Sequence, residues 1–456
     1  MQRHQVIRLS FLAVSTAFLV GCSSLQQSQS IDRSAELNAS LKKYVAWQNE
    51  QSGAKELTKL TDLIKIPILS DLVEHGLKNS PSLQQTILAL EIIKSKKQKT
   101  RGNQLPSADL SLSGNRVKDS DNQFDSDLSI SWELDIWSKL SDQTKAAEQD
   151  ILSSSATLQS ARDSLAANIM RTWLQSSYQT QLIAVEQERL GILENNEALV
   201  QQRYRSGIGS LKDLDSARTD TYSTRATIVE YEETLSQTNR TLAQLIGEHS
   251  ANYQLHIDQN FPDIVLPLAT LPEQDLARRP DLKKQYANIQ AAQLRANVAY
   301  KDLLPSFSLE AALSDSSDSL RDVLFADPVW SLLSQITLPL FQGGKLRAAR
   351  DIAELEAEQA YWAYQETLLT AITETENTLG LEKALVRQVT HINDALKSAQ
   401  SNSEHFKSKY KQGLVDILDL LQVQQQTFNL KAQWLQLTFD QLSNRIDLGL
   451  ALGLGV

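Results

Sequence analysis

The sequence predicts a mostly α-helical protein with a membrane-spanning β part and an internal twofold repeat. Three observations support this prediction: motifs that occur twice, segments in which apolar and polar residues alternate, and long stretches with coiled-coil periodicity. The paired motifs are Ser80–Leu83 and Arg279–Leu282, Leu105–Ser107 and Leu304–Ser306, Tyr204–Gly207 and Tyr410–Gly413, and Leu245–Gly247 and Ala451–Gly453. The last two of these pairs share an offset of 206 residues (410 − 204 and 453 − 247), which indicates two copies of one large half.

The start of the chain has the features of a secretory signal of the lipoprotein type. Two arginines precede an apolar run from Leu9 to Val20, which is too short for a transmembrane helix, and Cys22 follows it as the only cysteine. We predict that residues 1–21 are removed and that Cys22 carries an N-terminal lipid. The alternative is a buried, inert thiol. Ser23 follows the cysteine rather than an Asp, and in bacterial lipoproteins this resemblance points to the outer membrane.

Composition excludes other kinds of protein. The chain has a formal net charge of −10 and a pI near 5.3, so it lacks the basic surface that binding to nucleic acid requires. No run of 18 or more apolar residues follows the signal. A membrane-spanning part would therefore be β, because only helices and closed barrels satisfy the backbone in lipid.

Four segments alternate in the manner of membrane strands, at about 106–116, 124–137, 305–314 and 329–341. In the second of them, the even positions from Phe124 to Ile136 are apolar apart from Ser126, while acidic residues and serines occupy the odd positions. An ordinary soluble antiparallel sheet is the alternative. Four strands cannot close a barrel, since about eight are needed. Two chains would give eight strands and a filled barrel, whereas three would give twelve and leave a conduit.

The remaining sequence predicts long helices. Apart from Ser403 and Gln425, apolar residues keep a 4-3 spacing from Leu385 to Tyr410 and again from Leu421 to Ile446, which is a coiled-coil pattern interrupted at Gly413. The first half has a weaker version of the pattern around Gly207. A single helix from about Ser141 to Tyr204 would be roughly 90 Å long, and such a helix suits a pillar rather than an enzyme core.

These motifs resemble those of the TolC-type outer-membrane efflux factors, in their lipoprotein (NodT-like) branch. The resemblance covers nearly the whole mature chain, as residues 22–260 and 261–456 for the two repeats. It implies a homotrimer with a twelve-stranded barrel in the outer membrane and a coiled-coil α-helical barrel that extends into the periplasm. The motifs that carry it are Arg278–Leu282, Leu303–Phe307, Leu338–Leu346 and Trp132–Trp137.

The resemblance further implies a function and partners. The trimer would be the passive exit duct of a tripartite efflux pump for drugs or other small toxic solutes, lipid-anchored in the outer membrane. A periplasmic adaptor protein and an inner-membrane transporter would be its partners. Type I protein secretion and metal efflux remain open as alternatives, because the inner-membrane partner selects the cargo.

In this family the helix turns near Gly207, Gly413 and Leu414 contact the adaptor, and neighbouring residues close the pore. The resemblance implies that the periplasmic gate includes Asp213, Tyr410, Leu418 and Asp419. Relatives often place a second acidic residue one helical turn after Asp419. This chain has Gln422 there, so we expect a gate with fewer charges. Ordinary solvated helix surface is the alternative interpretation of Asp213 and Asp419.

Catalytic motifs are lacking in the sequence. The six histidines are scattered without metal-ligand spacing, and Gly343-Gly344-Lys345 lacks the frame of a phosphate-binding loop. We therefore expect no enzyme activity, no metal site and no cofactor other than the lipid. An outer-membrane hydrolase is a poor alternative, and a lipoprotein that only tethers envelope layers is a better one. A tether, however, needs no barrel strands.

Overall fold

The computed structural model describes residues 59–64, 67–119, 121–249, 261, 278–319, 321 and 327–456. All of them belong to one compact unit, Asn49–Val456. The predicted signal peptide and Cys22 lie outside the described residues. None of the helices in this part of the chain is both long and apolar enough to cross a membrane.

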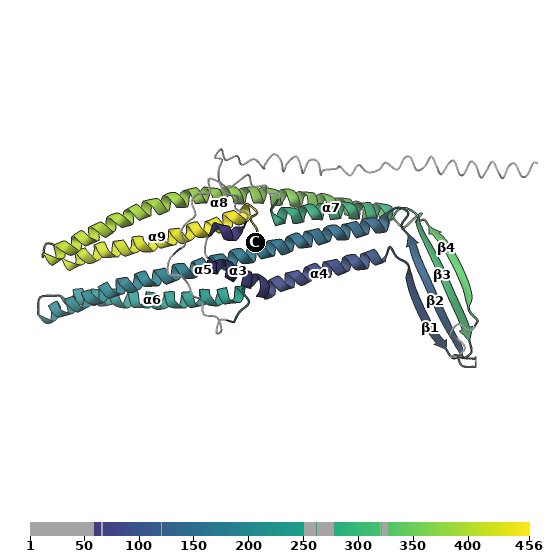
Figure 1. The fold of residues 1–456 in the computed structure, drawn as a ribbon, viewed down its shortest axis with the longest axis horizontal. Coiled ribbons are helices and arrows are strands. Elements are labelled where there is room, and N and C mark those ends of the chain that lie inside the picture. The colour runs from purple at the N-terminus through teal and green to yellow at the C-terminus, as the bar shows by residue number, and fades with distance from the viewer. Residues whose placement is uncertain are drawn as a thin grey trace, which may run out of the picture. The chain divides into compact units, whose positions relative to one another are not determined.

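The same order of helices and strands occurs twice along the chain, with helices of equal length at corresponding places (Figure 1). A helix of 22 residues leads into two strands, and helices of 67 and 35 residues follow them; this order occurs twice. At 1.5 Å per residue, each 67-residue helix is about 100 Å long. The elements are η2 Leu60–Leu63, α3 Pro67–Asn79, α4 Pro81–Gly102, β1 Ser107–Asn115, β2 Gln123–Leu134, α5 Lys139–Arg205, α6 Leu211–Leu245, α7 Pro280–Lys301, β3 Ser306–Ser317, β4 Val329–Thr337, α8 Lys345–Lys411 and α9 Ile417–Ala451.

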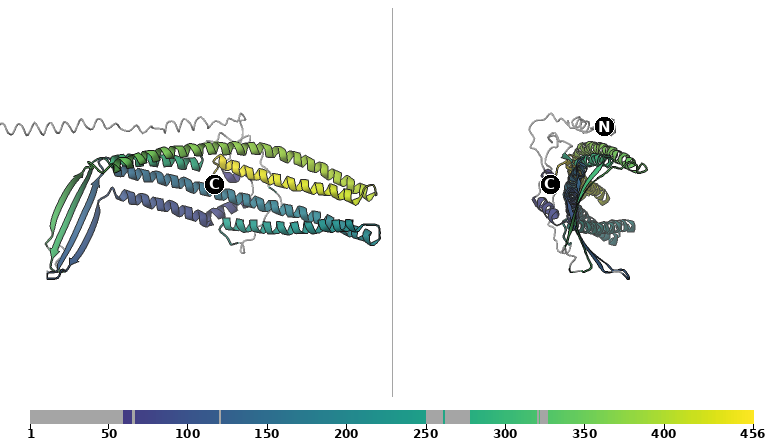
Figure 2. Two further views of the ribbon diagram at one scale, coloured as in Figure 1. Left: turned by 180° about the vertical axis from the view of Figure 1, so that it is seen from behind. Right: turned by 90° about the vertical axis from the view of Figure 1, so that its right-hand side faces the viewer.

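The helices form an open row rather than a closed bundle (Figures 1 and 2). Helix α5 packs against α4 and α7 along one part of its length and against α6 and α9 along the other, while α8 packs against α7 and α9. Within the described part of the chain, α8 has no extensive contact with α4 or α6. The row therefore has two unlike edges, one formed by α4 and α6 and the other by α8.

The four strands form one antiparallel sheet in the order β1-β2-β3-β4. Its register aligns apolar residues across all four strands: Leu110 lies opposite Leu128, which lies opposite Leu313, which lies opposite Trp330. Strands β1 and β4 are the edges and have no partner on their outer sides within the described residues. The sheet thus continues both edges of the helix row, with β1 on the side of α4 and β4 on the side of α8.

Three strand ends differ from the sequence prediction. Strand β2 ends at Leu134 rather than 137, because Asp135 accepts hydrogen bonds from the backbone nitrogens of Leu140 and Ser141 at 2.9 and 2.7 Å and so stabilises the start of α5, which begins at Lys139. Strand β4 ends at Thr337 rather than 341, and Pro339, which has no N–H, follows it. Strand β3 continues to Ser317, beyond the predicted 314, because it stays paired with β2 to Phe124.

The main apolar core lies around the middle of α5, where α3 and the ends of α6 and α9 meet it. Its largest buried side chain is Trp173, which is fully buried, and Met170 on the same helix is also fully buried. Each such buried side chain stabilises this core by roughly 2 kcal/mol. The core therefore holds the helices together near the middle of the row, between the sheet and the helix turns.

Candidate functional site

The first helix turn predicted to be functional joins α5 to α6. Helix α5 ends at Arg205, and Gly207 follows in the left-handed region with φ of 73°, where an L side chain would be strained. The backbone nitrogen of Ile208 donates to the carbonyl oxygen of Arg203 at 3.0 Å, which satisfies the helix end. Ser210 then starts α6, because its hydroxyl accepts a hydrogen bond from the backbone nitrogen of Asp213 at 3.1 Å.

The second turn, between α8 and α9, has the same construction. Helix α8 ends at Lys411, Gly413 has a φ of 72°, and the backbone nitrogen of Leu414 donates to the carbonyl oxygen of Lys409 at 2.9 Å. Asp416 caps α9, and its carboxylate accepts a hydrogen bond from the backbone nitrogen of Ile417 at 2.6 Å. The Tyr-x-x-Gly motifs thus mark two helix C-termini with glycine at the position that requires it.

The predicted gate residues occupy corresponding places at these two turns. Asp213 and Asp419 both lie in the first turn of their helices, three residues after the capping residue. Their carboxylates are therefore also well placed to stabilise the helix N-termini, by about 0.3–1 kcal/mol each. Leu418 is 54% exposed, and Gln422 is exposed one turn further along α9.

Tyr410 is half-buried in the last turn of α8, and Leu414 is 68% exposed at the turn itself. In the described part of the chain, the side chains of Tyr410, Asp419 and Gln422 form no hydrogen bond or ion pair with one another, although all three lie close in sequence to the turn between α8 and α9.

Sequence reasoning missed an ion pair that connects the two turns. Arg203, in the last turn of α5, lies 3.9 Å from the carboxylate of Asp416, the residue that caps α9. Both side chains are more than half exposed, so the pair is a weak contact in water. The spacing of Asp416 and Asp419 is that of a helix start with acidic residues at both capping positions, and this signal could have identified Asp416.

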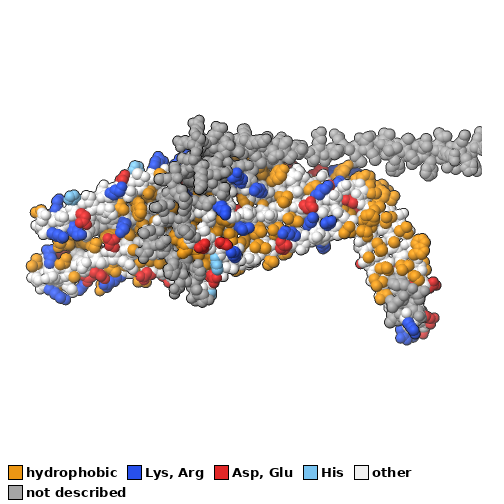
Figure 3. Space-filling view, in the orientation of Figure 1, with side chains coloured by type: hydrophobic (Ala, Val, Ile, Leu, Met, Phe, Trp, Pro, Cys, Tyr) orange, Lys and Arg blue, Asp and Glu red, His pale blue; other side chains and the backbone are white. Residues whose placement is uncertain are grey.

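The sheet offers two chemically different faces. One face carries the apolar residues that the register aligns, interrupted by Ser334 and, near the sheet end, Asp315. The opposite face carries mainly serines and carboxylates, with Val329 and Leu333 of β4 as exceptions. Figure 3 shows apolar side chains gathered over the strands. The strand carboxylates on the polar face are Asp109, Asp125, Asp127, Glu133 and Glu310, and no Lys or Arg lies in any of the four strands.

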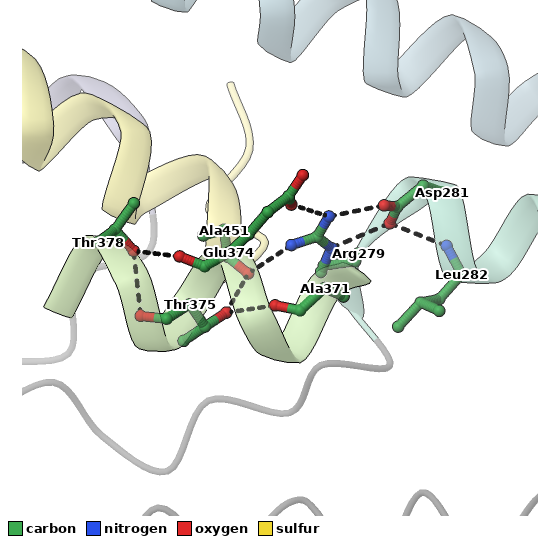
Figure 4. A network of polar contacts seen from close by, with 8 residues as sticks. All are labelled: Arg279, Asp281, Leu282, Ala371, Glu374, Thr375, Thr378 and Ala451. Atoms are coloured by element: carbon green, nitrogen blue, oxygen red, sulfur yellow. Dashed lines mark hydrogen bonds and ion pairs between the residues drawn. The ribbon is translucent and has the colours of Figure 1, made fainter. Parts of the chain in front are cut away.

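A buried arginine holds three segments together at the start of α7 (Figure 4). Arg279 donates to both carboxylate oxygens of Asp281 at 3.1 and 2.7 Å, to Glu374 of α8 at 2.8 Å and to the carbonyl oxygen of Ala451 at 3.2 Å. Burial opposes its charged form, but the hydrogen bonds to Asp281 and Glu374 raise its pKa above the ordinary value. This arrangement satisfies a buried charge and fixes α7 against α8 and the end of α9.

A cleft of about 420 Å³ lies beside this arginine and is lined in part by Asp163, Glu374 and Asp447. Burial raises the pKa of Asp163, although hydrogen bonds from Val456 and Gln159 oppose the shift. No group of three or more side chains among the described residues is arranged to hold a metal ion. Cys22, the predicted lipid site, lies outside the described residues.

Comparison with known proteins identifies the family. The sequence model of the family described as "Outer membrane efflux protein" matches residues 72–248 and 271–454. The chain is 25% identical over 398 residues to "Probable outer membrane lipoprotein SilC" of Salmonella typhimurium, covering 85% of this chain and 86% of SilC. It is also 25% identical over 393 residues to "Cation efflux system protein CusC" of Escherichia coli O6:H1, covering 84% and 85%.

The fold agrees with these sequence relationships. The crystal structure of the Campylobacter jejuni CmeC outer membrane channel has a TM-score of 0.80 with this protein at 22% identity, over 90% of this chain and 91% of that one. The mostly helical fold with one small sheet is thus the fold of a solved outer-membrane channel. Together with the family match over both parts of the chain, this shows that the protein belongs to the outer membrane efflux protein family.

Proposed function

We propose that three copies of this chain form the passive exit duct of a tripartite efflux pump. The protein is an outer-membrane efflux channel, as its family and relatives establish. In the proposed assembly, the strands of three copies close a twelve-stranded barrel in the outer membrane. The long helices continue it as an α-helical barrel into the periplasm.

The observation that carries this proposal is the pair of unlike open edges. An apolar sheet with unpaired edges cannot remain in lipid, because each unpaired backbone group costs several kcal/mol there. Since β1 and β4 are different surfaces, copies associate head to tail, and such contacts close into a ring when the rotation allows it. Two copies would give eight strands and a filled barrel, whereas three give twelve and leave a conduit.

The equal element lengths support an internal twofold repeat. We assign residues 22–260 to the first repeat and 261–456 to the second, after a signal peptide of residues 1–21. In this view each copy contributes two equivalent halves to the ring. Cys22, as the mature N-terminus, carries the lipid that anchors the chain to the outer membrane.

The helix turns are the proposed end of the duct that meets its partners. Gly207, Gly413 and Leu414 would contact a periplasmic adaptor protein, which connects the duct to an inner-membrane transporter. Threefold symmetry would bring Asp419 of each copy close to the axis, together with Tyr410, Leu418 and Gln422, and Asp213 beside them. Three neighbouring carboxylates repel one another, so closure would require hydrogen-bond donors such as Tyr410 or a bound cation.

The proposed cargo is a drug or another small toxic solute. The name of CusC assigns that protein to cation efflux, so metal ions are the first alternative, and type I protein secretion is the second. Cargo is best tested in cells. Deletion of the gene should increase sensitivity to particular solutes, and the full-length gene should restore resistance.

Purified protein in planar bilayers tests the channel itself. Unboiled protein should migrate as a trimer and produce discrete conductance steps, and boiled protein should do neither. Monomeric protein without conductance would contradict the duct. That result would favour a lipoprotein that only tethers layers of the envelope.

A further inference from the structure

We propose that Lys96 of one copy pairs with Glu356 of the next, at a junction between copies that repeats the junction between the two halves of one chain. The inference rests on the proposed trimer and specifies its interface. It is drawn from the contacts between α5 and α7, which lie at the junction between the two halves.

Two constant offsets relate the halves. Helix α8 begins and ends 206 residues after α5 (345 − 139 and 411 − 205), and α7 begins and ends 199 residues after α4 (280 − 81 and 301 − 102). The strand register obeys the same offsets, since the pair Ser107 and Ser131 becomes Ser306 and Thr337. A contact between α5 and α7 therefore has an equivalent between α8 of one copy and α4 of the next.

One ion pair at the internal junction has a counterpart of opposite charges at the positions that the two offsets give. Arg295 of α7 lies 2.5 Å from Asp150 of α5. The equivalent residues are Lys96 (295 − 199) and Glu356 (150 + 206), again a base and an acid. Both are exposed on the open edges, and neither forms an ion pair within the described part of the chain. A second copy supplies the partner that each lacks.

Apolar residues on the open edges correspond to buried residues at the internal junction. Leu88 is 61% exposed, whereas its equivalent Ala287 is 3% exposed. Trp362 is 60% exposed, whereas its equivalent Ala156 is 9% exposed. Large apolar side chains left in water at positions that are buried elsewhere in the same architecture mark a surface that another copy covers. The equivalent pairs, with the buried residue first, are Ala287 and Leu88, Ala291 and Ile92, Ala146 and Ile352, Ala156 and Trp362, Phe428 and Tyr222, and Leu435 and Val229.

The strands give the same result for the barrel. Within one chain, Ile130 lies opposite Ala311 and Trp132 opposite Leu309. The equivalent pairs between copies are Ile336 with Leu112, Leu338 with Leu110 and Leu340 with Ala108. All six residues are apolar and would continue the apolar face. Leu340, which lies beyond the end of β4 at Thr337, is 87% exposed in a single copy.

Thiol cross-linking tests the interface by position. Ser153 and Asn288 are hydrogen-bonded at 2.7 Å across the internal junction, and their equivalents are Gln359 and Ala89. The double variant Ala89→Cys, Gln359→Cys, treated with a short bifunctional thiol reagent in membranes, should yield cross-linked dimers and trimers. Each single variant should yield none. The double variant Ser153→Cys, Asn288→Cys is the matched control and should cross-link within one chain, without an increase in mass.

Charge exchange tests the ion pair itself. Lys96→Glu and Glu356→Lys should each lower the temperature at which the trimer dissociates, and the double exchange should restore most of the loss. Lys78→Glu is the control, because Lys78 is also exposed but pairs with Glu74 on its own helix. A trimer that neither cross-links nor shows restoration would overturn this interface but leave the channel intact. A monomer without conductance would instead refute the proposed function.

Discussion

The two faces of the sheet can be distinguished by one substitution at adjacent residues. Ala311 lies on the apolar face of β3, between Ile130 of β2 and Leu332 of β4. Ala312 lies on the polar face, between Ser129 and Ser331. Both alanines are half-buried in the central part of the same strand, so an aspartate at either position has similar effects on strand formation.

We expect Ala311→Asp to prevent assembly and Ala312→Asp to be tolerated. A charge on the lipid face near the bilayer centre costs about 2 kcal/mol or somewhat less for an acidic residue. Three copies repeat this penalty, so the trimer loses roughly 5 kcal/mol, which corresponds to a factor of several thousand in its assembly constant. On the polar face, the added carboxylate meets water and serine hydroxyls, and the penalty should be small.

The assay compares the yield of heat-modifiable trimer in outer-membrane fractions and the conductance per unit of protein. Trimer should be nearly absent for Ala311→Asp and close to wild type for Ala312→Asp. Equal yields for the two variants would refute the assignment of the apolar face to lipid. A loss confined to Ala312→Asp would mean that the two faces are exchanged.

Three further predictions concern the helical part and the anchor. Gly247→Ala should destabilise the protein by about 2–4 kcal/mol, because Gly247 has a φ of 81° and a Cβ there would lie 2.4 Å from the carbonyl oxygen of Asn79. Thermal unfolding measures this, and Gly191→Ala, where a Cβ meets no atom within 4 Å, should not be destabilised. Asp419→Ala should raise conductance and sensitivity to large antibiotics if its carboxylate helps to hold the gate closed; unchanged values in both assays would identify Asp419 as helix surface. Cys22→Ser should abolish palmitate labelling and leave conductance intact, and a labelled variant would contradict the lipid site.

Local patterns were sufficient for much of the fold. The alternation in residues 124–136 predicted which face of β2 is apolar, because side chains in a strand point to opposite sides in turn. Gly207 and Gly413, three residues after Tyr204 and Tyr410, predicted the helix ends, because only glycine readily adopts positive φ. The strand ends were less well predicted, since Asp135 binds the first backbone nitrogens of α5 instead of continuing strand β2.

The candidate site was predicted only in part. Sequence alone located Asp213 and Asp419 near the helix turns, but it did not indicate that both lie in first helical turns, where they also stabilise helix ends. It gave no sign that Arg203 approaches Asp416, or that Arg279 reaches Glu374. Such contacts join segments that are far apart in the chain, and their geometry depends on how whole helices pack.

By itself, the sequence determined the fold class, mostly helical with a small sheet, through its strand alternation and long helical periodicity, because each of these is a local or periodic property. Only the tertiary structure decided which surfaces stay open. Leu88 and Ala287 are both apolar residues at equivalent helix positions, and nothing local separates them. The fold buries Ala287 on α7, which packs against both α5 and α8, and leaves Leu88 exposed on α4, because one chain supplies no neighbour for the outer side of α4.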